Sequence, residues 1–306
     1  MILVAGLSPA WQQTILLDEL RVGEVNRARE VHWCASGKVL NVAMALHRLG
    51  MPCQAISIAA GPVGALLRND FARQGAACEW IETSGNSRVC TTILEGGRKV
   101  TTELVENAAA IGTGDLERFR AAFRAALPAA KFVVFTGSLP AGVPKDLYAE
   151  LLAEVTVPSL LDLQGPVLDL ALSRRPTVVK PNREELANTL KRPLENDRDL
   201  LTAMREVCST GPEWAVVSAG GGTLFAASQS AAYRVQPPAM TVVNPIGSGD
   251  CLAAGIACGL FSGESFANSL RFGVAAASEN VRHLMPAQLN PTTVRALSEE
   301  VRIEEV

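Results

Sequence analysis

The sequence predicts an α/β fold built around a mostly parallel β-sheet, and three observations support this prediction. Short apolar segments alternate along the chain with segments whose apolar residues recur at helical spacing, as βαβ units require. Several of the apolar segments are hydrophobic at every position, which is typical of strands covered on both faces. Hydrophobic residues make up 48% of the 306 residues and charged residues 19%, so the chain can bury a large core.

The individual elements follow from these two patterns. Strands are expected over residues 2–5, 54–59, 132–135, 159–162, 177–179, 214–218 and 223–226. The first helix is expected to run from Val39 to Leu49 and to end at Gly50. Asp115 is the expected N-cap of the next helix, which Pro128 ends. Further helices are expected over 145–155, 183–190, 197–209, 251–262, 265–283 and 292–300.

Two regions depart from this alternation and predict a small, mainly antiparallel sheet. Residues 88–95 and 98–105 flank Gly96-Gly97, which is a signal for a two-residue hairpin. Residues 14–18 and 25–31 also look extended. Because such a sheet cannot bury both of its faces, we expect it to serve as a lid over a cleft, as a dimer surface, or as both.

Composition and charge exclude several classes of function. The 28 Lys and Arg residues against 31 Asp and Glu residues give a net charge of −3, so we expect no nucleic-acid or membrane partner. No apolar run is long enough to span a bilayer, and the N-terminus lacks the basic region of a secretory signal. Any anionic ligand must therefore be held by a local site.

The cysteines and histidines favour a reduced, cytoplasmic protein and argue against a zinc ribbon or a histidine-based metal site. The seven cysteines are odd in number and form no C-x-x-C motif, which argues against a disulfide framework or a zinc ribbon. The three histidines, His32, His47 and His283, are far apart in the sequence. A histidine-based metal site is therefore not expected.

Residues 244–250 read Asn-Pro-Ile-Gly-Ser-Gly-Asp and carry the strongest chemical signal. Glycines let the backbone approach a ligand closely, and the following helix would present its positive end to an anion. Asp250 could then take a proton from an attacking hydroxyl. The alternative is a tight turn in which Asp250 only caps the helix.

Two further loops carry weaker signals. Residues 35–38 read Ala-Ser-Gly-Lys but do not form a Walker A loop, because His32 and Val39 occupy two of its required positions. Two readings fit Lys38: an anion ligand at a glycine turn, or a solvated lysine. Ser138 follows the apolar segment 132–135, where open α/β sheets bind ligands, although an ordinary loop is equally compatible.

Residues 178–186 contain a fourth candidate site. Asn182 and Glu185 lie three residues apart at the start of a predicted helix. Their oxygens could orient water around Mg²⁺, or they could form a capping box, and the spacing fits both. The glycines at 112–114 and 220–222 make no G-x-G-x-x-G motif, so dinucleotide binding is not supported.

The order of these motifs resembles that of the PfkB-type (ribokinase-like) sugar kinases, in the branch of 1-phosphofructokinase and tagatose-6-phosphate kinase. Residues 35–42 read Ala-Ser-Gly-Lys-Val-Leu-Asn-Val where that branch has A-G-G-K-G-[IL]-N-V. Further matches lie, in the family's order, at 25–27, 87–88, 136–140, 180–186 and 244–250. The resemblance implies a three-layer ribokinase-like fold, with one kinase domain over 1–306 and a lid formed by about 12–31 and 88–105.

The resemblance also implies roles for individual residues. Asp250 would be the catalytic base beside an anion hole of Gly247, Ser248 and Gly249. The substrate and its phosphate would be held by Gln12, Gly37, Lys38, Asn41, Arg88 and Ser138. Lys180, Ser218 and Gly220 would line the nucleotide site with Gly247 and Gly249, while Asn182 and Glu185 would serve Mg²⁺ through water.

The chain differs from the branch mainly on the sugar side. Gln12 stands where the branch has an Asp that binds sugar hydroxyls, and Ser36 and Val39 replace two glycines beside Lys38. Asp250 and its glycines are unchanged.

The leading hypothesis is therefore ATP- and Mg²⁺-dependent phosphorylation of a ketohexose phosphate by a homodimer paired through the lid. The alternatives are a kinase for an unphosphorylated sugar or nucleoside, and a non-catalytic sugar-phosphate-binding protein.

Overall fold

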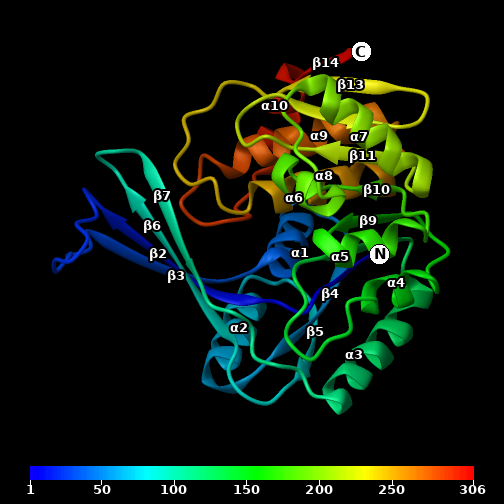
Figure 1. Cartoon of the computed structure of the whole chain (residues 1–306). Helices are drawn as coiled ribbons and strands as arrows, with labels where there is room; N and C mark the ends of the chain where they lie inside the picture. Colours follow the sequence, from blue (N-terminus) through cyan, green and yellow to red (C-terminus); the bar gives the residue numbers. More distant parts are fainter.

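The computed structural model describes residues 1–306 and contains two separate β-sheets (Figure 1). The large sheet has the order β14-β13-β12-β11-β10-β9-β8-β1-β4-β5. In this sheet, β11, β10, β9, β8, β1, β4 and β5 all pair with their neighbours in parallel. The strands β12, β13 and β14 extend the sheet beyond β11 in antiparallel pairs. The predicted mostly parallel sheet is thus confirmed. Its strands are β1 (Ile2–Ala5), β4 (Cys53–Ala59), β5 (Cys78–Glu82), β8 (Phe132–Thr136), β9 (Ser159–Asp162), β10 (Val178–Val179), β11 (Trp214–Val217), β12 (Leu224–Ala227), β13 (Ala232–Gln236) and β14 (Arg302–Glu305).

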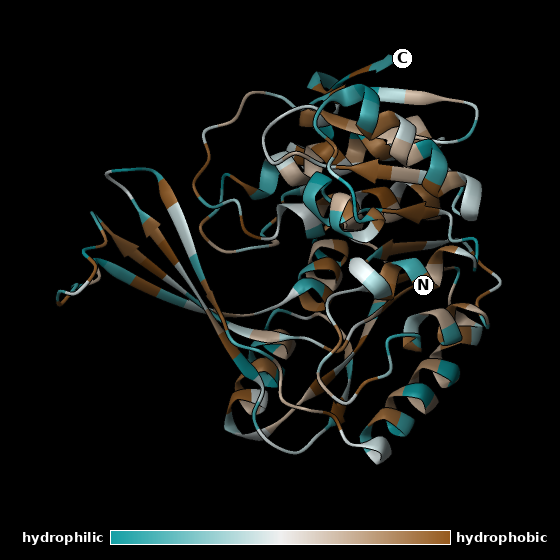
Figure 2. Ribbon diagram, viewed as in Figure 1, coloured by the Kyte–Doolittle hydropathy of each residue, from teal (hydrophilic) through white to brown (hydrophobic).

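Helices cover both faces of this sheet and complete the three predicted layers. Ile2 and Val4 of β1 point into one hydrophobic core, while Leu3 and Ala5 point into the other, because successive side chains of a strand alternate. Figure 2 shows the hydrophobic residues concentrated along these central strands. The first core is closed by α1 (Lys38–Arg48), α2 (Gly61–Arg73), α8 (Ser248–Phe261), α9 (Phe266–Asn280) and α10 (Pro291–Glu300), and the second by α3 (Thr113–Ala126), α4 (Leu147–Leu152), α5 (Gly165–Leu172), α6 (Arg183–Leu190) and α7 (Asp197–Thr210).

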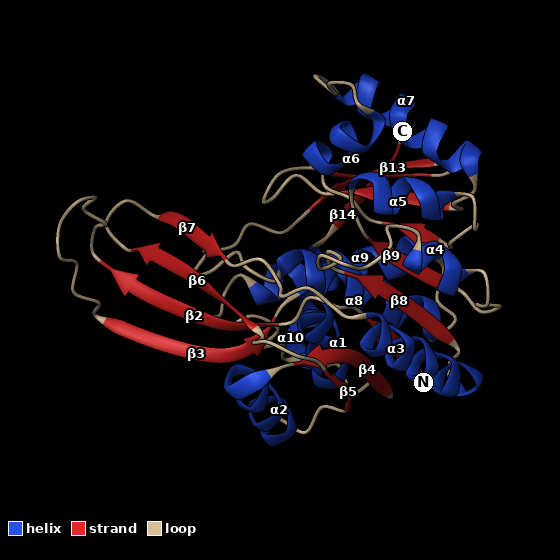
Figure 3. Cartoon of the chain, turned by 60° about the horizontal axis from the view of Figure 1, so that its bottom comes forward, coloured by secondary structure: helices blue, strands red, loops and turns tan.

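The small sheet projects from one side of the main body (Figures 1 and 3). It consists of β3 (Glu30–Ser36), β2 (Ala10–Leu17), β6 (Arg88–Glu95) and β7 (Val100–Val105), in the order β3-β2-β6-β7. The outer pairs are antiparallel as predicted, but the central pair β2–β6 is parallel.

Two details of the predicted small sheet are wrong. The extended segment expected at 25–31 is mostly loop, and the strand begins at Glu30 instead. The connection after β6 is not a two-residue hairpin but spans 96–99, with Lys99 in the left-handed region at φ 55°. The Lys99 N–H donates to the Glu95 carbonyl at 2.8 Å and closes the longer turn, so the two glycines occupy only its first half.

Several helix boundaries also differ from the prediction. Gly112, not Asp115, is the N-cap of α3, and Asp115 lies within the first turn. The helices α2 and α5 were not predicted, because Gly61-Pro62 and Gly165-Pro166 look like turn signals. Proline is nevertheless tolerated in the first turn of a helix, where its missing N–H would have no intrahelical partner. The short 3₁₀-helix η1 (Leu127–Ala129) follows α3 at the predicted stop.

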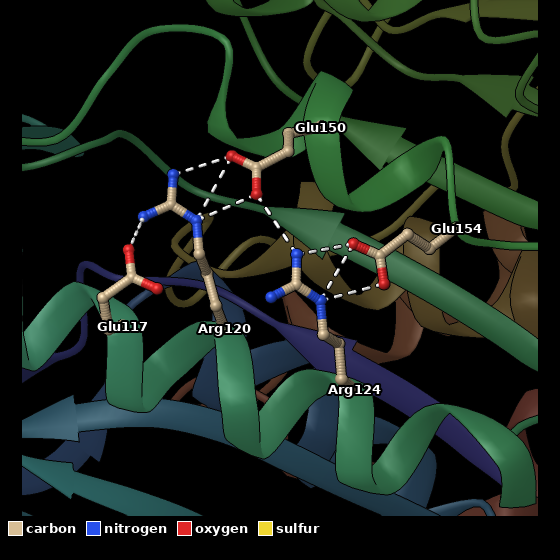
Figure 4. Close-up of polar contacts among 5 residues, drawn as sticks. All are labelled: Glu117, Arg120, Arg124, Glu150 and Glu154. Atoms are coloured by element: carbon tan, nitrogen blue, oxygen red, sulfur yellow. Dashed lines mark hydrogen bonds and ion pairs between the residues drawn. The ribbon is translucent and has the colours of Figure 1, made fainter.

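A network of charged side chains joins α3 to α4 and the residues after it (Figure 4). Arg120 donates to Glu150 at 2.7 Å and to Glu117 at 2.9 Å, and Arg124 donates to Glu154 at 2.7 Å. The hydrogen bond from Arg120 is the main cause that lowers the pKa of Glu150. The network ties α4, a helix of six residues, to the side of α3.

No helix in the structure combines the length and the hydrophobicity needed to cross a membrane.

Candidate active site

The topology of the large sheet places several polar residues at one edge. The strands β4 and β5 lie on one side of β1, and β8, β9, β10 and β11, which come later in the chain, lie on the opposite side of β1. The strand order therefore reverses at β1. Such a reversal opens a crevice at the carboxyl ends of the strands, where α/β proteins bind ligands. The residues that follow these strands there are Ser8, Ser138, Asp162, Lys180 and Ser218.

Three adjoining cavities occupy this crevice. The outer cavity, of about 540 Å³, is lined by Ser218 and Gly220 and by apolar residues of α8 and α9. The middle cavity, of about 340 Å³, shares Ser218 and Gly249 with it and contains Asp250. A third cavity, of about 570 Å³, contains Ser138 and shares Lys38 and Arg88 with the middle one. All fifteen residues predicted for the site line at least one of these cavities.

The 244–250 segment forms a tight loop that leads into α8. Gly247 is the N-cap, with φ 82° in the left-handed region, and a Cβ there would lie 2.8 Å from Pro286 Cβ. The backbone N–H groups of Gly249 and Asp250 have no acceptor within the chain, whereas Ser248 N–H donates to the Pro245 carbonyl at 3.2 Å. Asp250 lies inside the first turn, so the alternative that it merely caps the helix is wrong.

One residue outside the predicted set holds this loop in place. The Asn280 side chain, from the end of α9, donates to the Ile246 carbonyl at 2.9 Å and accepts from the Ala287 N–H at 2.8 Å. No local sequence signal distinguishes Asn280 from an ordinary polar residue of a helix.

Asp250 is buried and has a single side-chain donor. Asn41 Nδ2 donates to Asp250 Oδ2 at 2.7 Å, and Ser36 Oγ donates to Asn41 Oδ1 at 2.9 Å, which fixes the orientation of the amide. Burial, and then the charge of Asp162, raise the pKa of Asp250 to about 6, against the lowering effects of Lys38, Asn41 and Lys180. Because this pKa lies just below neutrality, Asp250 can act as a general base at physiological pH.

Asp162, at the end of β9, organises the cations of the site and was not predicted. Its Oδ1 lies 3.2 Å from Lys38 Nζ and 3.2 Å from Lys180 Nζ. Burial would raise the pKa of Asp162, but the two lysines outweigh it and lower the pKa. The available signal was its position at the carboxyl end of the predicted strand 159–162, where α/β proteins bind ligands.

Arg88 is anchored by the backbone at the boundary of the middle and third cavities. Its guanidinium donates to the carbonyls of Ser8 at 2.8 Å, Pro9 at 3.3 Å and Glu106 at 3.3 Å. Of the five N–H donors of a guanidinium, this leaves two for a ligand. Gly37 has φ 90°, and a Cβ there would lie 2.8 Å from the Ser8 carbonyl oxygen. Only glycine therefore lets the backbone beside Lys38 pack this closely against the Ser8–Ala10 segment.

Asn182 and Glu185 form the capping box of α6. Asn182 Oδ1 accepts from the Glu185 N–H, and Glu185 Oε2 accepts from the Asn182 N–H, both at 2.8 Å. Both residues also line the middle cavity, and Glu185 Oε1 lies 3.9 Å from Lys38 Nζ. No group of three or more His, Cys, Asp or Glu side chains is placed to hold a metal. Of these two side chains, Glu185 Oε1 is the oxygen that the capping box leaves unused, so it is the atom that could contact water around Mg²⁺.

The outer cavity combines an apolar wall with a polar border. Leu252, Val274 and Ala277 give it an apolar wall, and the 220–222 loop and Ser218 border it. Lys180, predicted for this site, lies instead in the middle cavity, where its Nζ is 3.6 Å from the position of a Cβ at Gly249. Lys180 thus borders the anion loop rather than the apolar part of the outer cavity.

A free anion site, a buried carboxylate and paired lysines at one edge of a parallel sheet suit an enzyme that transfers phosphoryl groups. The model of the pfkB family carbohydrate kinases matches residues 9–293, and the chain belongs to this family of kinases. The family uses ATP, generally with Mg²⁺.

Solved structures share the fold over nearly the whole chain. Phosphofructokinase-2 from Escherichia coli in complex with substrates and products has a TM-score of 0.90 at 23% identity, covering 98% of both chains. The protein described as "Possible 1-phosphofructokinase" from Thermotoga maritima has a TM-score of 0.92 at 21% identity, covering 100% of this chain and 99% of its own. At these identities the likeness shows the fold alone.

Proposed function

We propose that this kinase transfers the γ-phosphoryl group of ATP to a hydroxyl of a ketohexose phosphate: fructose 1-phosphate, fructose 6-phosphate or tagatose 6-phosphate. The observation that carries the proposal is the pair Lys38 and Arg88 at the boundary of the middle and third cavities, on the far side of Asp250 from the nucleotide cavity. Cations at this point favour an acceptor that carries an anionic group of its own.

In this proposal each cavity binds a different part of the two substrates. ATP occupies the outer cavity, with its phosphates at the free N–H groups of Gly249 and Asp250 and beside Lys180. The acceptor occupies the middle cavity, where Asp250 takes the proton of the attacking hydroxyl. Its own phosphate lies at Arg88, Lys38 and Ser138. Mg²⁺, when bound with ATP near Asn182 and Glu185, supplies charge neutralisation for the transferred group.

A kinase for an unphosphorylated sugar or nucleoside is the second candidate, and one observation favours it. The Lys38 ammonium is already paired with Asp162 and close to Glu185, so part of its charge is neutralised within the protein. A non-catalytic binding protein is disfavoured by the intact environment of Asp250.

A coupled assay of ADP release, run over sugars, nucleosides and the three ketohexose phosphates, tests the proposal. We expect the highest kcat/KM with one of the three phosphates. A higher kcat/KM with an unphosphorylated sugar or nucleoside would favour the second candidate, and turnover with none of them would favour a binding protein.

We expect Arg88→Ala to raise KM for the sugar phosphate by about 10- to 100-fold, because charge-assisted bonds to phosphate are worth about 1.5–3 kcal/mol. KM for ATP should stay nearly unchanged. Arg98→Ala, which removes an exposed arginine of the lid ion-paired to Glu19, is the matched control. An equal loss with the corresponding unphosphorylated sugar would show that Arg88 only holds the loop at Ser8 and Pro9.

We also propose that the chain is one kinase domain whose small sheet serves as a lid and pairs two copies. The sheet face turned away from the middle cavity exposes Val31, Trp33, Val100 and Leu104, with Trp33 44% and Leu104 59% exposed. Both outer strands also present unpaired edges, which a second copy would cover.

Light scattering at micromolar concentration is expected to give the mass of a dimer, and Leu104→Glu is expected to give a monomer. Thr101→Glu, on the opposite face of β7, serves as the control and should remain dimeric. A monomeric wild type would contradict the proposed dimer, but it would not contradict the proposed role of the small sheet as a lid.

A further inference from the structure

The middle cavity is lined by four carboxylates, and one of them has no partner. Asp162 pairs with two lysines, Asp250 accepts from Asn41, and Glu185 completes a capping box near Lys38. Glu103, on β7, has neither a hydrogen-bond donor nor an ion-pair partner within the chain. A carboxylate that borders a polar cavity without a partner is available to a ligand.

The register of the small sheet aligns Glu103 with a row of polar side chains. Glu103 lies opposite Thr92 of β6, and Thr92 lies opposite Thr14 of β2, so all three share the face that carries Gln12. Gln12 Nε2 donates to Thr92 Oγ1 at 2.8 Å and to the Gln13 carbonyl at 3.1 Å. Both amide hydrogens are thus used within the lid, and Gln12 Oε1, at the cavity, remains without a donor.

A second polar atom of this row also lacks a partner. Thr14 is fully buried, and its Oγ1 makes no hydrogen bond. Thr14 does not line the middle cavity, so a ligand there cannot reach it. The acceptors of this face that border the cavity and have no donor within the chain are therefore Gln12 Oε1 and the Glu103 carboxylate.

We propose that Glu103, together with Gln12 Oε1, accepts hydrogen bonds from hydroxyl groups of the acceptor sugar and thereby selects among sugars. The inference rests on the proposed function, since it takes the occupant of the middle cavity to be a polyol. Neighbouring hydroxyls of a sugar are donors, and a carboxylate can accept from two of them at once.

The environment of Glu103 agrees with this role. The residue as a whole is exposed, yet partial burial of its carboxyl raises the pKa, and no neighbouring cation offsets this effect. Donors from a bound sugar would compensate the lost hydration of the carboxylate. Arg88 begins β6, whereas Glu103 pairs with Thr92 further along that strand. With the phosphate at Arg88 and Lys38, as in the proposed function, Glu103 would face the hydroxyl-bearing part of the substrate.

The test compares Glu103→Gln with the matched control Glu30→Gln, which removes a carboxylate from the outer end of the same sheet. We expect Glu103→Gln to raise KM for the best sugar phosphate by about 10- to 100-fold, with KM for ATP nearly unchanged. Glu30→Gln should match the wild type. Deoxy analogues of the sugar, each lacking one hydroxyl, provide the second readout.

The analogues separate direct contact from a structural role. The wild type should discriminate against at least one analogue by about tenfold or more, and Glu103→Gln should lose that discrimination. Unchanged discrimination in the variant, or an equal rise in KM for ATP, would overturn the role of Glu103 while leaving the proposed function intact. Dissociation of the variant's dimer in light scattering, with KM restored at high protein concentration, would assign Glu103 to the dimer contact instead. If the wild type neither binds nor phosphorylates any of the three sugar phosphates, the proposed function fails, and the role of Glu103 fails with it.

Discussion

Asp250→Asn is expected to lower kcat by about 10²–10⁴-fold, because the variant keeps the shape of the site and loses its base. KM for ATP should stay near the wild-type value, since the N–H groups of the 247–249 loop are unaffected. Steady-state kinetics with the best sugar phosphate measures both. Asp169→Asn, an exposed acid on α5, is the control, and it should behave as wild type. Retention of kcat within about threefold in Asp250→Asn would remove Asp250 from the role of base.

The same carboxylate determines how activity depends on pH. Catalysis requires the ionised form, and burial raises the pKa of Asp250 to about 6, so kcat should fall about tenfold per pH unit below about pH 6. Asn41→Leu removes the hydrogen bond that helps to lower this pKa, and it should move the acid limb to higher pH. An acid limb that stays in place would mean that another group controls it.

The raised pKa also has a consequence for the stability of the Asn variant. The folded-state pKa of about 6 lies above the ordinary value of 3.8, so the folded protein binds this proton more tightly than the unfolded chain does. The wild type therefore loses stability as the pH rises from about 4 to about 6, by roughly 3 kcal/mol at most. Asp250→Asn should accordingly unfold at higher urea concentration than wild type at pH 7.5, and the difference should shrink near pH 4.

Asp162→Asn is expected to cost about 3–5 kcal/mol of unfolding free energy, because it leaves the buried Lys180 without its counterion. Lys180 is 5% exposed and Asp162 is 1% exposed, so water cannot replace the lost partner. Urea unfolding at pH 7.5 measures the effect. The stabilising contribution of Asp162 is present above its unfolded pKa and is lost as the pH falls through its lowered folded pKa, so the difference should disappear in acid.

An exposed pair provides the control for this prediction. Asp197→Asn makes the same chemical change in the surface pair with Arg183 and should cost at most about 1 kcal/mol. Combining Asp162→Asn with Lys180→Met should cost less than the sum of the two single variants, because each single variant leaves a buried charge alone. Equal costs for Asp162→Asn and Asp197→Asn would contradict the buried ion pair.

The strands that could be predicted are those buried on both faces. β1 is apolar throughout, β8 is apolar at every position but the last, and β9 has two buried leucines at its centre, and their positions were predicted to within one residue. β5, β13 and β14 were missed because they lie at or near the edges of the sheet and carry polar residues such as Glu79, Arg234 and Glu304. Their pairing is decided by neighbouring strands, which a local pattern does not contain.

The sequence by itself determined the α/β class, the mostly parallel sheet and the glycine loop with Asp250, because each depends on residues adjacent along the chain. The capping box of Asn182 and Glu185 belongs to the same category, since its spacing within one helical turn is sufficient. Only the tertiary structure decided which charged side chains of the site have a partner within the protein and which do not. Lys38 meets Asp162 across 124 positions of sequence, and Glu103 faces the cavity unpaired because of the register between β6 and β7. The energy of an ion pair depends on the distance between the two charges in space. Strand register brings residues that are far apart in the sequence to within that distance, and the local sequence does not predict which residues these are.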